Sequence, residues 1–501
     1  MKTICKILAF VLVLTVACFI IAACGNNSDT DNLPSKNAGA GDSNSINSNV
    51  EDAQAETTDS RLYADIPEDT DFGGYKFNIF ALLENKDVDT EEQNADTVND
   101  AVYIRNRTVE EKLGIEINVI QPDAEYADLS SAVTRSITAD DQAYDAVYQR
   151  VGPQYNLALK GRYYDFNEIL YIDMTQPWWD QQARKGMSIN NELYVAVGDI
   201  STSDKDYTWI LAFNKNLLND LGLESPYKLV NEKRWTYNAF YEMVRAAALD
   251  LNDDGKLWTD DKVGMVTHHQ TVLAFYFSSG ERVSKKDEND YPSIVMNTER
   301  ASKVMEETVK LVSKSNPYTL TAVEWSFDGV GVQDTAAIMF TEKRALFFAE
   351  ILNIVPKLRD MKIDFGLIPY PMLDESQDGY HTMVNWSVPM YSVPSNAENI
   401  ERTGIILETL ANESRYTLIP AYYDTALKTK FLRDEESTEI LDLIFATRVY
   451  DVAHLFKWGG MTDSYIIMAM KGEANFASLW EKNETKLVTA MERSIEAFSN
   501  K

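Results

Sequence analysis

Apolar and polar positions in the first part of the folded sequence follow two alternating periods. Residues 76–81 and 115–120 alternate with the two-residue period of a half-buried strand. Between them, apolar residues over 98–113 recur at helical spacing and stop at a glycine. A polar helix over 127–138 and a third strand over 144–148 complete the series. This order predicts a largely parallel sheet covered by helices, which binds ligands at the carboxyl ends of its strands.

The same alternation returns in the middle of the chain. The pattern over 209–215 predicts a strand that leads into a helix over 217–221, and Thr236 is expected to cap a helix that reaches about residue 248. Strand and helix patterns then alternate from 263 to about 372. Beyond Pro394 the pattern is mostly helical. We therefore expect two α/β units followed by helices.

The N-terminus is typical of a secretory signal. Lys2 and Lys6 precede an apolar run that ends in Ile21-Ala22-Ala23-Cys24. This tetrad resembles the bacterial lipobox, which implies a signal peptide over 1–23 and lipidation of Cys24 (palmitate). An ordinary membrane helix with an incidental cysteine is the alternative, because the run is nearly long enough to span a bilayer.

Residues 24–72 are expected to be a disordered tether. Small and polar residues dominate this stretch, and its few apolar residues follow no period. About 46 residues of flexible coil span roughly 35–40 Å root-mean-square. Such a tether would hold a globular domain clear of a bilayer.

Composition excludes several classes of protein. A chain of 501 residues is too long for one hydrophobic core, so two or more domains are expected. The net charge of −31 argues against nucleic acid as a partner, because a polyanion binder needs a basic patch. All three cysteines, Cys5, Cys18 and Cys24, belong to the leader or its end. The mature domain therefore has no disulfide, no thiolate metal site and no cysteine nucleophile.

Four motifs carry a resemblance to a known family. Their order along the chain is similar to that in extracellular solute-binding proteins of family 1, the carbohydrate-type receptors of ABC importers. The motifs are Ala212-Phe-Asn-Lys-Asn-Leu-Leu218, Ser225-Pro-Tyr-Lys-Leu-Val230 with Trp235-Thr236, Phe340-Thr-Glu-Lys-Arg-Ala-Leu-Phe347 and Asp364-Phe-Gly-Leu-Ile-Pro-Tyr-Pro371. The resemblance covers nearly everything after the tether.

The resemblance implies a two-lobed, periplasmic-binding-protein-like α/β fold of type II. Each lobe would be a mainly parallel sheet flanked by helices, with the ligand in the cleft between them. Motif order places the crossings near 199–206, 379–386 and 420–428. Lobe 1 would then comprise 73–204 and 380–424, and lobe 2 would comprise 205–379 and the C-terminal helices of 425–501. The family likeness also implies a monomer.

One acidic stretch matches a calcium loop. Oxygen-bearing side chains stand at positions 1, 3 and 5, a glycine stands at 6 and a carboxylate at 12. An aspartate at position 12 and a strand pattern directly afterwards depart from the usual motif. The sequence predicts a structural Ca²⁺ held by Asp250, Asn252, Asp254, the carbonyl of Lys256 and Asp261. An Asx-rich surface turn uses the same residues and is the alternative.

Aromatic and carboxylate side chains near strand ends and crossings are the candidate ligand-binding residues. Sugar rings stack their C–H faces on aromatic rings, and their hydroxyls pair with carboxylates. We expect Asp199, Trp325, Glu350, Trp386 and Trp458 to line the cleft, because the tryptophans lie in irregular or crossing segments and the family resemblance places the strand ends before the two carboxylates at the cleft. Each tryptophan could instead be a core residue, and each carboxylate a surface one.

Catalysis has little support in the sequence. The four histidines, His268, His269, His381 and His454, form no zinc motif, and no serine-hydrolase or phosphate-loop motif occurs. We therefore expect a receptor and not an enzyme: a protein on the extracellular face of the bacterial cytoplasmic membrane, anchored by lipid on Cys24. It would capture a sugar or oligosaccharide and deliver it to an ABC transporter permease. A secreted glycoside hydrolase and a receptor for a peptide or other solute remain the alternatives.

Overall fold

The computed structural model describes most of the chain from Arg61 onward. The predicted signal peptide, Cys24 and the tether up to residue 60 lie outside the described residues. Residues 61–72 were also assigned to the tether, yet Arg61 pairs with Glu413 at 2.5 Å and the Phe72 N–H donates to the Leu113 carbonyl at 2.8 Å. The described residues are 61–82, 87–122, 128–313, 316–323, 325–358, 364–423, 427 and 435–499.

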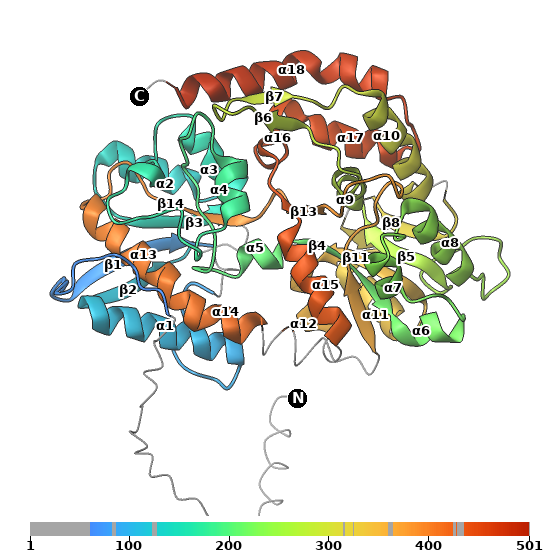
Figure 1. The fold of residues 1–501 in the computed structure, drawn as a ribbon, viewed down its shortest axis with the longest axis horizontal. Helices are drawn as coiled ribbons and strands as arrows, with labels where there is room; N and C mark the ends of the chain where they lie inside the picture. Colours follow the sequence, from blue (N-terminus) through green and yellow to red (C-terminus); the bar gives the residue numbers. More distant parts are fainter. Residues whose placement is uncertain are drawn as a thin grey trace, which may run out of the picture. The chain divides into compact units, whose positions relative to one another are not determined.

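A four-stranded sheet organises the first α/β half. Its strands are β1 (Tyr75–Ala81), β2 (Ile115–Ile120), β3 (Ala146–Arg150) and β14 (Pro389–Ser392), in the order β14-β3-β1-β2. β1 is parallel to β2 and β3, as the sequence predicts, and β14 runs opposite to β3. Figure 1 shows β1, β2 and β3 in blue to teal and β14 of the same sheet in orange, with helices around the sheet.

A five-stranded sheet organises the second half. Its strands are β4 (Trp209–Asn214), β5 (Val263–His268), β8 (Thr319–Ala322), β11 (Ala345–Ile351) and β12 (Phe365–Ile368), in the order β12-β4-β11-β5-β8. Four of these strands share one direction and β4 alone opposes its neighbours. β4 and β14 are each the first strand after the chain crosses from one half to the other. Each therefore enters its sheet at the edge where the parallel strands end, and runs antiparallel to them. Both sheets are therefore mainly parallel, with one reversed strand each.

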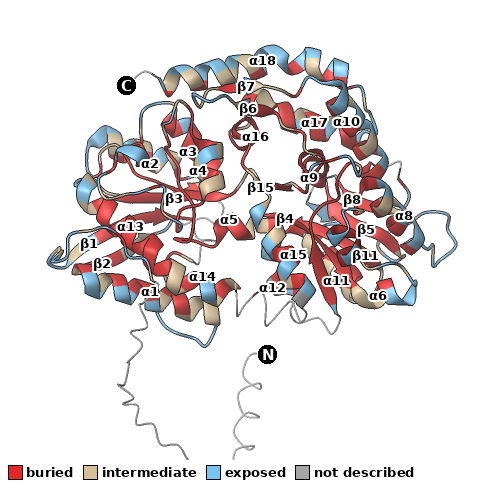
Figure 2. Cartoon of the chain, in the orientation of Figure 1, coloured by how far each residue is buried: buried red, intermediate tan, exposed pale blue. Residues whose placement is uncertain are grey.

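Helices cover both sheets and bury their apolar faces. α1 (Thr97–Leu113) begins at Asp96, whose carboxylate accepts the N–H groups of Val98 and Asn99, and ends at Gly114 in the left-handed conformation. α13 (Ile400–Tyr416) packs on α1, and α15 (Glu435–Ala446) packs on β12. Figure 2 shows buried strands at the centre of each half and exposed residues on the outer faces of the helices.

The remaining elements complete the two halves and the segments between them. The other longer helices are α2 (Ser130–Ala139), α3 (Val151–Ala158), α8 (Tyr237–Ala247), α9 (Thr271–Ser278), α10 (Glu299–Val312), α11 (Val332–Thr341), α17 (Met461–Met470) and α18 (Phe476–Ala497). The short ones are η1 (Phe166–Glu168), α4 (Gln181–Met187), α5 (Ser203–Asp206), α6 (Lys215–Asp220), α7 (Pro226–Asn231), η2 (Leu352–Ile354), α12 (Val355–Leu358), α14 (Leu418–Pro420), α16 (Val452–Leu455) and η4 (Trp458–Gly460). Two-stranded pairings join β6 (Ser284–Lys286) to β7 (Pro292–Ile294), β9 (Ser326–Phe327) to β10 (Val330–Gly331), and β13 (Thr382–Met383) to β15 (Arg448–Val449).

Chain segments far apart in sequence meet between the halves. The Asn385 N–H donates to the Tyr207 carbonyl at 2.8 Å, and the Leu352 N–H donates to the Thr208 carbonyl at 2.9 Å. Asn385 lies in the second crossing expected from the sequence, and Tyr207 and Thr208 directly follow the first, expected over 199–206. The C-terminal helix α18, expected to belong to the second lobe, contacts both halves: it packs against β7 and α10, and its Ser494 hydroxyl pairs with Tyr155 of α3.

Candidate ligand-binding site

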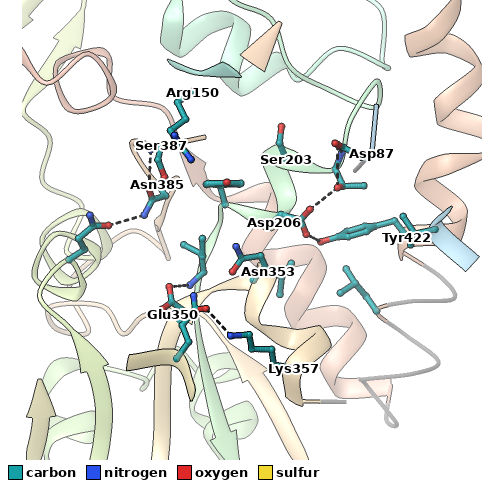
Figure 3. Close-up of a pocket in the computed structure, with 18 of the residues that line it drawn as sticks. Asp87, Arg150, Ser203, Asp206, Glu350, Asn353, Lys357, Asn385, Ser387 and Tyr422 are labelled. Atoms are coloured by element: carbon teal, nitrogen blue, oxygen red, sulfur yellow. Dashed lines mark hydrogen bonds between the residues drawn. The ribbon is translucent and has the colours of Figure 1, made fainter. Parts of the chain in front are cut away.

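A cavity of about 1140 Å³ lies between the carboxyl ends of the two sheets. Arg150 at the end of β3, His268 at the end of β5 and Glu350 near the end of β11 form parts of its wall. The crossing segments supply the rest, as Figure 3 shows for Ser203, Asp206 and Asn385. The position follows from the topology, because parallel strands present all their carboxyl ends at one edge.

Two carboxylates, Asp87 and Asp206, form a hydrogen-bonded network with Thr202 at the crossing segment around α5. The Thr202 N–H donates to Asp87 Oδ2 at 2.8 Å, and the Thr202 hydroxyl donates to Asp206 Oδ2 at 2.6 Å. The Tyr422 hydroxyl donates to the other oxygen of Asp206 at 2.7 Å. Burial raises the pKa of Asp206 to about 6 against these hydrogen bonds, and burial also raises the pKa of Asp87. The cavity thus holds two carboxylates that lose their protons less readily than a solvated aspartate does.

A buried histidine–carboxylate pair forms the wall on the five-stranded sheet. His268 Nε2 lies 3.2 Å from Glu350 Oε2, and the Ile351 N–H donates to Glu350 Oε1 at 2.9 Å. Burial alone would raise the pKa of Glu350, but the attraction of His268 and these hydrogen bonds hold it below its usual value. Glu350 is therefore an ionised acceptor that can receive hydrogen bonds from ligand hydroxyls.

Aromatic rings stand on two sides of the cavity. Trp325 is 55% exposed, and its ring centroid lies 4.6 Å from that of His268 and 5.1 Å from that of His269. Trp386 lines the cavity from the second crossing, and Lys457 Nζ lies 3.6 Å from its ring centroid. An exposed indole beside a buried carboxylate offers a sugar both an apolar face and a hydrogen-bond acceptor.

Amide and hydroxyl groups line the remaining wall. The Asn385 side-chain amide donates to Gln270 Oε1 at 3.0 Å, while Asn385 Oδ1 accepts from the Ser387 hydroxyl at 2.7 Å. Lys357 Nζ of α12 donates to Asp334, at the start of α11, at 3.0 Å. Sequence reasoning missed all of these residues. Gln270 follows the end of β5 and Asn385 adjoins Trp386, so the rule that placed Glu350 at a strand end could have found them.

The structure brings together three of the five predicted ligand-binding residues. Trp325, Glu350 and Trp386 line the cavity. Asp199 lies outside its lining and pairs with Arg415 at 3.0 Å and Lys205 at 3.7 Å. Trp458 is also outside the lining: it is 1% exposed, and its Nε1 donates to the Tyr155 hydroxyl at 3.0 Å. Both satisfy their polar groups within the protein, which spacing along the chain does not reveal.

The acidic loop adopts a series of Asx turns. Asp250 accepts the N–H groups of Asn252 at 3.2 Å and Gly255 at 2.8 Å, and Asp254 accepts the N–H of Lys256 at 2.8 Å. Asp261, fully buried at the end of the loop, accepts from two further backbone N–H groups. Within the described ranges, no group of three or more His, Cys, Asp or Glu side chains is placed to hold a metal ion. The Asx-rich turn accounts for these contacts, and calcium binding stays a prediction.

Several solved structures share this fold. A cyclo/maltodextrin-binding protein complexed with maltotetraose aligns with a TM-score of 0.56 at 13% identity, over 84% of this chain and 97% of its own. An ABC transporter solute-binding protein from Thermotoga lettingae, bound with α-D-tagatose, aligns with a TM-score of 0.53 at 14% identity, over 85% and 100%. An ABC substrate-binding protein from Listeria monocytogenes, in complex with cycloalternan, aligns with a TM-score of 0.54 at 12% identity, over 84% and 99%.

These similarities confirm the periplasmic-binding-protein-like α/β fold class. No protein-family model and no curated protein matches the chain. Over the residues that the structure describes, none of the helices combines the length and the apolar character needed to cross a bilayer.

Proposed function

We propose that this protein is a solute-binding protein that captures a carbohydrate in the cavity and delivers it to the permease of an ABC importer. The observation that carries the proposal is that exposed Trp325 and buried Glu350 line the same cavity at the carboxyl edge of one sheet. An indole stacks on the C–H face of a sugar, and an ionised carboxylate accepts its hydroxyls. The sugars bound by the three solved structures support this ligand class.

The topology supplies a mechanism for signalling that the ligand is bound. Cavity walls come from both sheets and from the crossings between them. A ligand that touches both walls stabilises an arrangement in which they are close together, by its differential affinity for that arrangement. A permease that recognises the liganded arrangement would then accept loaded protein in preference to empty protein.

The binding function is supported over catalysis. Glu350 is paired with His268, and Asp206 accepts hydrogen bonds from two hydroxyls, so each carboxylate is held by the protein itself. A glycosidase needs one carboxyl group to protonate the leaving oxygen and a second to act as nucleophile or base. The solved structures with this fold are described as binding proteins, which supports the same choice.

Binding and turnover can be separated in one experiment. Purified protein is titrated with a panel of neutral oligosaccharides by calorimetry, and each mixture is then analysed for cleavage products. We expect binding without turnover, weakened about tenfold or more by Trp325→Ala and by Glu350→Gln. Trp480→Ala on α18, outside the cavity, is the matched control and should leave the affinity unchanged. Measurable product would overturn the receptor function, and peptide binding without sugar binding would overturn the ligand class.

The N-terminal sequence supports a location for this receptor at the membrane surface. Lipidation of Cys24 after removal of residues 1–23 would anchor it on the extracellular face of the cytoplasmic membrane, and we propose that it acts there as a monomer. Cys24→Ala should abolish incorporation of labelled palmitate and release the protein from the membrane fraction. Membrane retention of the unlipidated variant would contradict the anchor.

A further inference from the structure

A second groove adjoins the ligand cavity. It has a volume of about 860 Å³ and is formed by α2, α3, the turn before η4 and α18. Trp386 belongs to the walls of both spaces. Trp386 therefore stands where the cavity and the groove meet, and a chain-like ligand could continue past it from one into the other.

The groove is basic within a strongly acidic protein. Its charged wall residues are Arg135 of α2, Lys160 after α3, Lys457 and Arg493 of α18, against the single carboxylate of Asp128. We call these four cations and Asp128 the basic groove. The chain as a whole carries 78 acidic and 47 basic residues, so four cations to one carboxylate reverses its general balance.

Within the described residues, most cations of the basic groove have no carboxylate partner. Among the residues that the structure describes, Arg135, Lys160 and Arg493 form no ion pair. Lys457 is shared between Asp463, at 3.4 Å, and the ring of Trp386, at 3.6 Å. Asp128 is engaged locally, because its carboxylate accepts the Ser130 N–H at 2.8 Å. Among the residues that the structure describes, the positive charge of this groove is therefore largely uncompensated, and it attracts an added anion.

Hydroxyl groups accompany the charges. Ser130, Ser131 and Thr134 line the same wall of the groove. The Ser130 Oγ is buried and has no hydrogen-bond partner within the described part of the chain. Hydroxyls on the wall that carries Arg135 can donate hydrogen bonds to an oxyanion in the groove.

The ligand cavity has the opposite character. Its lining contains five carboxylates, those of Asp87, Asp96, Asp206, Asp334 and Glu350, against the cations Arg150 and Lys357. Neutral hydroxyls pair well with such carboxylates, whereas an anionic group would be repelled there. An acidic substituent on a bound carbohydrate would therefore favour the basic groove over the cavity.

We propose that the basic groove binds an anionic substituent, a carboxylate or a sulfate ester, on the same carbohydrate whose neutral units occupy the cavity. This inference rests on the proposed function, and it makes the ligand an acidic oligosaccharide. The chain would pass Trp386, with its charged unit between α2 and α18.

The test compares neutral and acidic forms of one ligand. Tetrasaccharides of α-1,4-glucose, β-1,4-glucose and β-1,4-galactose are each titrated in the neutral form and in forms whose unit at one end or the other is a hexuronate or carries a 6-sulfate, at low and high NaCl. Inorganic sulfate is titrated separately. For a backbone that binds, we expect an acidic form to bind about tenfold more tightly at low salt, with most of the advantage lost at about 0.5 M salt. Whether the hexuronate or the 6-sulfate form binds more tightly then identifies the anion that the groove prefers.

Substitutions in the basic groove test whether its cations cause the preference for the acidic form. Arg135→Gln with Lys160→Gln should remove the acidic advantage and leave the affinity for the neutral form unchanged, because neither residue lines the cavity. The matched control is Lys303→Gln with Lys482→Gln, two exposed lysines outside the groove, which should keep the advantage. Circular dichroism and melting temperature check that the variants fold.

Each other outcome overturns the proposal in a distinguishable way. Equal affinity for neutral and acidic forms would remove the groove from the ligand site and leave the proposed function intact. Stabilisation by inorganic sulfate without any preference for acidic sugars would make the groove a site for free anions. Loss of neutral-sugar binding in the double variant would assign these residues a structural role. Failure of all tetrasaccharides to bind would overturn the proposed carbohydrate function itself.

Discussion

The indole Nε1 of Trp258 donates a hydrogen bond to a carboxylate oxygen of Asp328 at 3.0 Å. The Trp258 ring also packs edge-on against Phe327, with ring centroids 5.9 Å apart. Trp258 belongs to the acidic loop, and Asp328 is at the tip of the β9–β10 hairpin, which follows Trp325 directly. The Val332 N–H donates to the Trp325 carbonyl at 2.8 Å and closes the base of the hairpin. The acidic loop thus contacts and stabilises the hairpin that follows Trp325, an aromatic residue of the cavity wall.

Trp258 should therefore affect sugar affinity without touching the ligand. Trp258→Phe keeps an aromatic ring against Phe327 but removes the hydrogen bond to Asp328, so the hairpin holds Trp325 less firmly. Since such a bond contributes about 1 kcal/mol, we expect affinity to fall about three- to tenfold. Calorimetry measures the change, and Asp328→Asn, which retains an acceptor oxygen, should be milder. Unchanged affinity in Trp258→Phe would separate the loop from the site.

Arg448 should be a stability determinant of the region between the halves. Its guanidinium pairs with Asp180 at 2.7 Å and with Asp204 at 2.5 Å, and all three side chains are largely buried. Arg448→Met leaves two buried carboxylates without their shared cation, which should cost about 3–5 kcal/mol of the free energy of unfolding. Arg448→Lys keeps the charge and should cost less. Urea denaturation measures both, and wild-type stability in Arg448→Met would contradict the assignment.

Glu408 should make stability depend on pH. The indoles of Trp178 and Trp179 donate to its two oxygens at 3.0 and 2.8 Å, and burial raises the pKa of Glu408 from 4.5 to about 7. Between these values the folded protein keeps a proton that the unfolded chain has lost. The contribution of Glu408 to the free energy of unfolding is therefore largest below pH 4.5. It decreases as the pH rises to about 7 and is constant above that. The whole effect is about 3 kcal/mol.

Substitution isolates this contribution. Glu408→Gln cannot ionise, so the difference in free energy of unfolding between wild type and variant should change with pH between about 4.5 and 7. One indole loses its acceptor, which lowers the stability of the variant by a constant amount. Glu401→Gln, at an exposed position of the same helix, is the control and should show no such pH-dependent difference. A constant difference between Glu408→Gln and wild type would show that Glu408 ionises normally.

Calcium should raise the melting temperature if the acidic loop binds it. Millimolar CaCl₂ is expected to stabilise the wild type, and Asp250→Ala should abolish the rise. Asp250 also accepts two backbone N–H groups, so the variant loses turn stability in any case. Asp287→Ala removes a comparable turn, in which Asp287 accepts the N–H groups of Asn289 and Tyr291, and should keep the calcium response. No response in the wild type would leave the loop as a turn only.

Local sequence was a good guide to the elements of the first half. The alternation over 76–81 and 115–120 corresponds to β1 and β2, and Gly114 ends α1 as expected. The third predicted strand is displaced by two residues, to Ala146–Arg150. Farther on, Thr236 caps α8 by accepting the Ala239 N–H at 3.4 Å. These features depend on near neighbours in the chain, so periodicity and capping chemistry reveal them.

The site was decided by contacts between distant segments. The family resemblance places the end of the strand that carries Glu350 at the cleft, and Glu350 lines the cavity. Trp325 and Trp458 were indistinguishable by position, yet one is an exposed cavity wall and the other is buried against Tyr155. Asp199 was expected in the cleft and is instead paired with Arg415, more than two hundred residues away.

The sequence by itself determined the strand and helix pattern, the α/β class and the strand edge at which the cavity lies, because these follow from short-range periodicity and chain direction. Tertiary structure alone decided which polar side chains satisfy one another and which remain for a ligand. It also gathered Arg135, Lys160, Lys457 and Arg493 into one groove from four separate segments. Hydrogen-bond satisfaction and charge compensation depend on distances in space, which spacing along the chain does not encode.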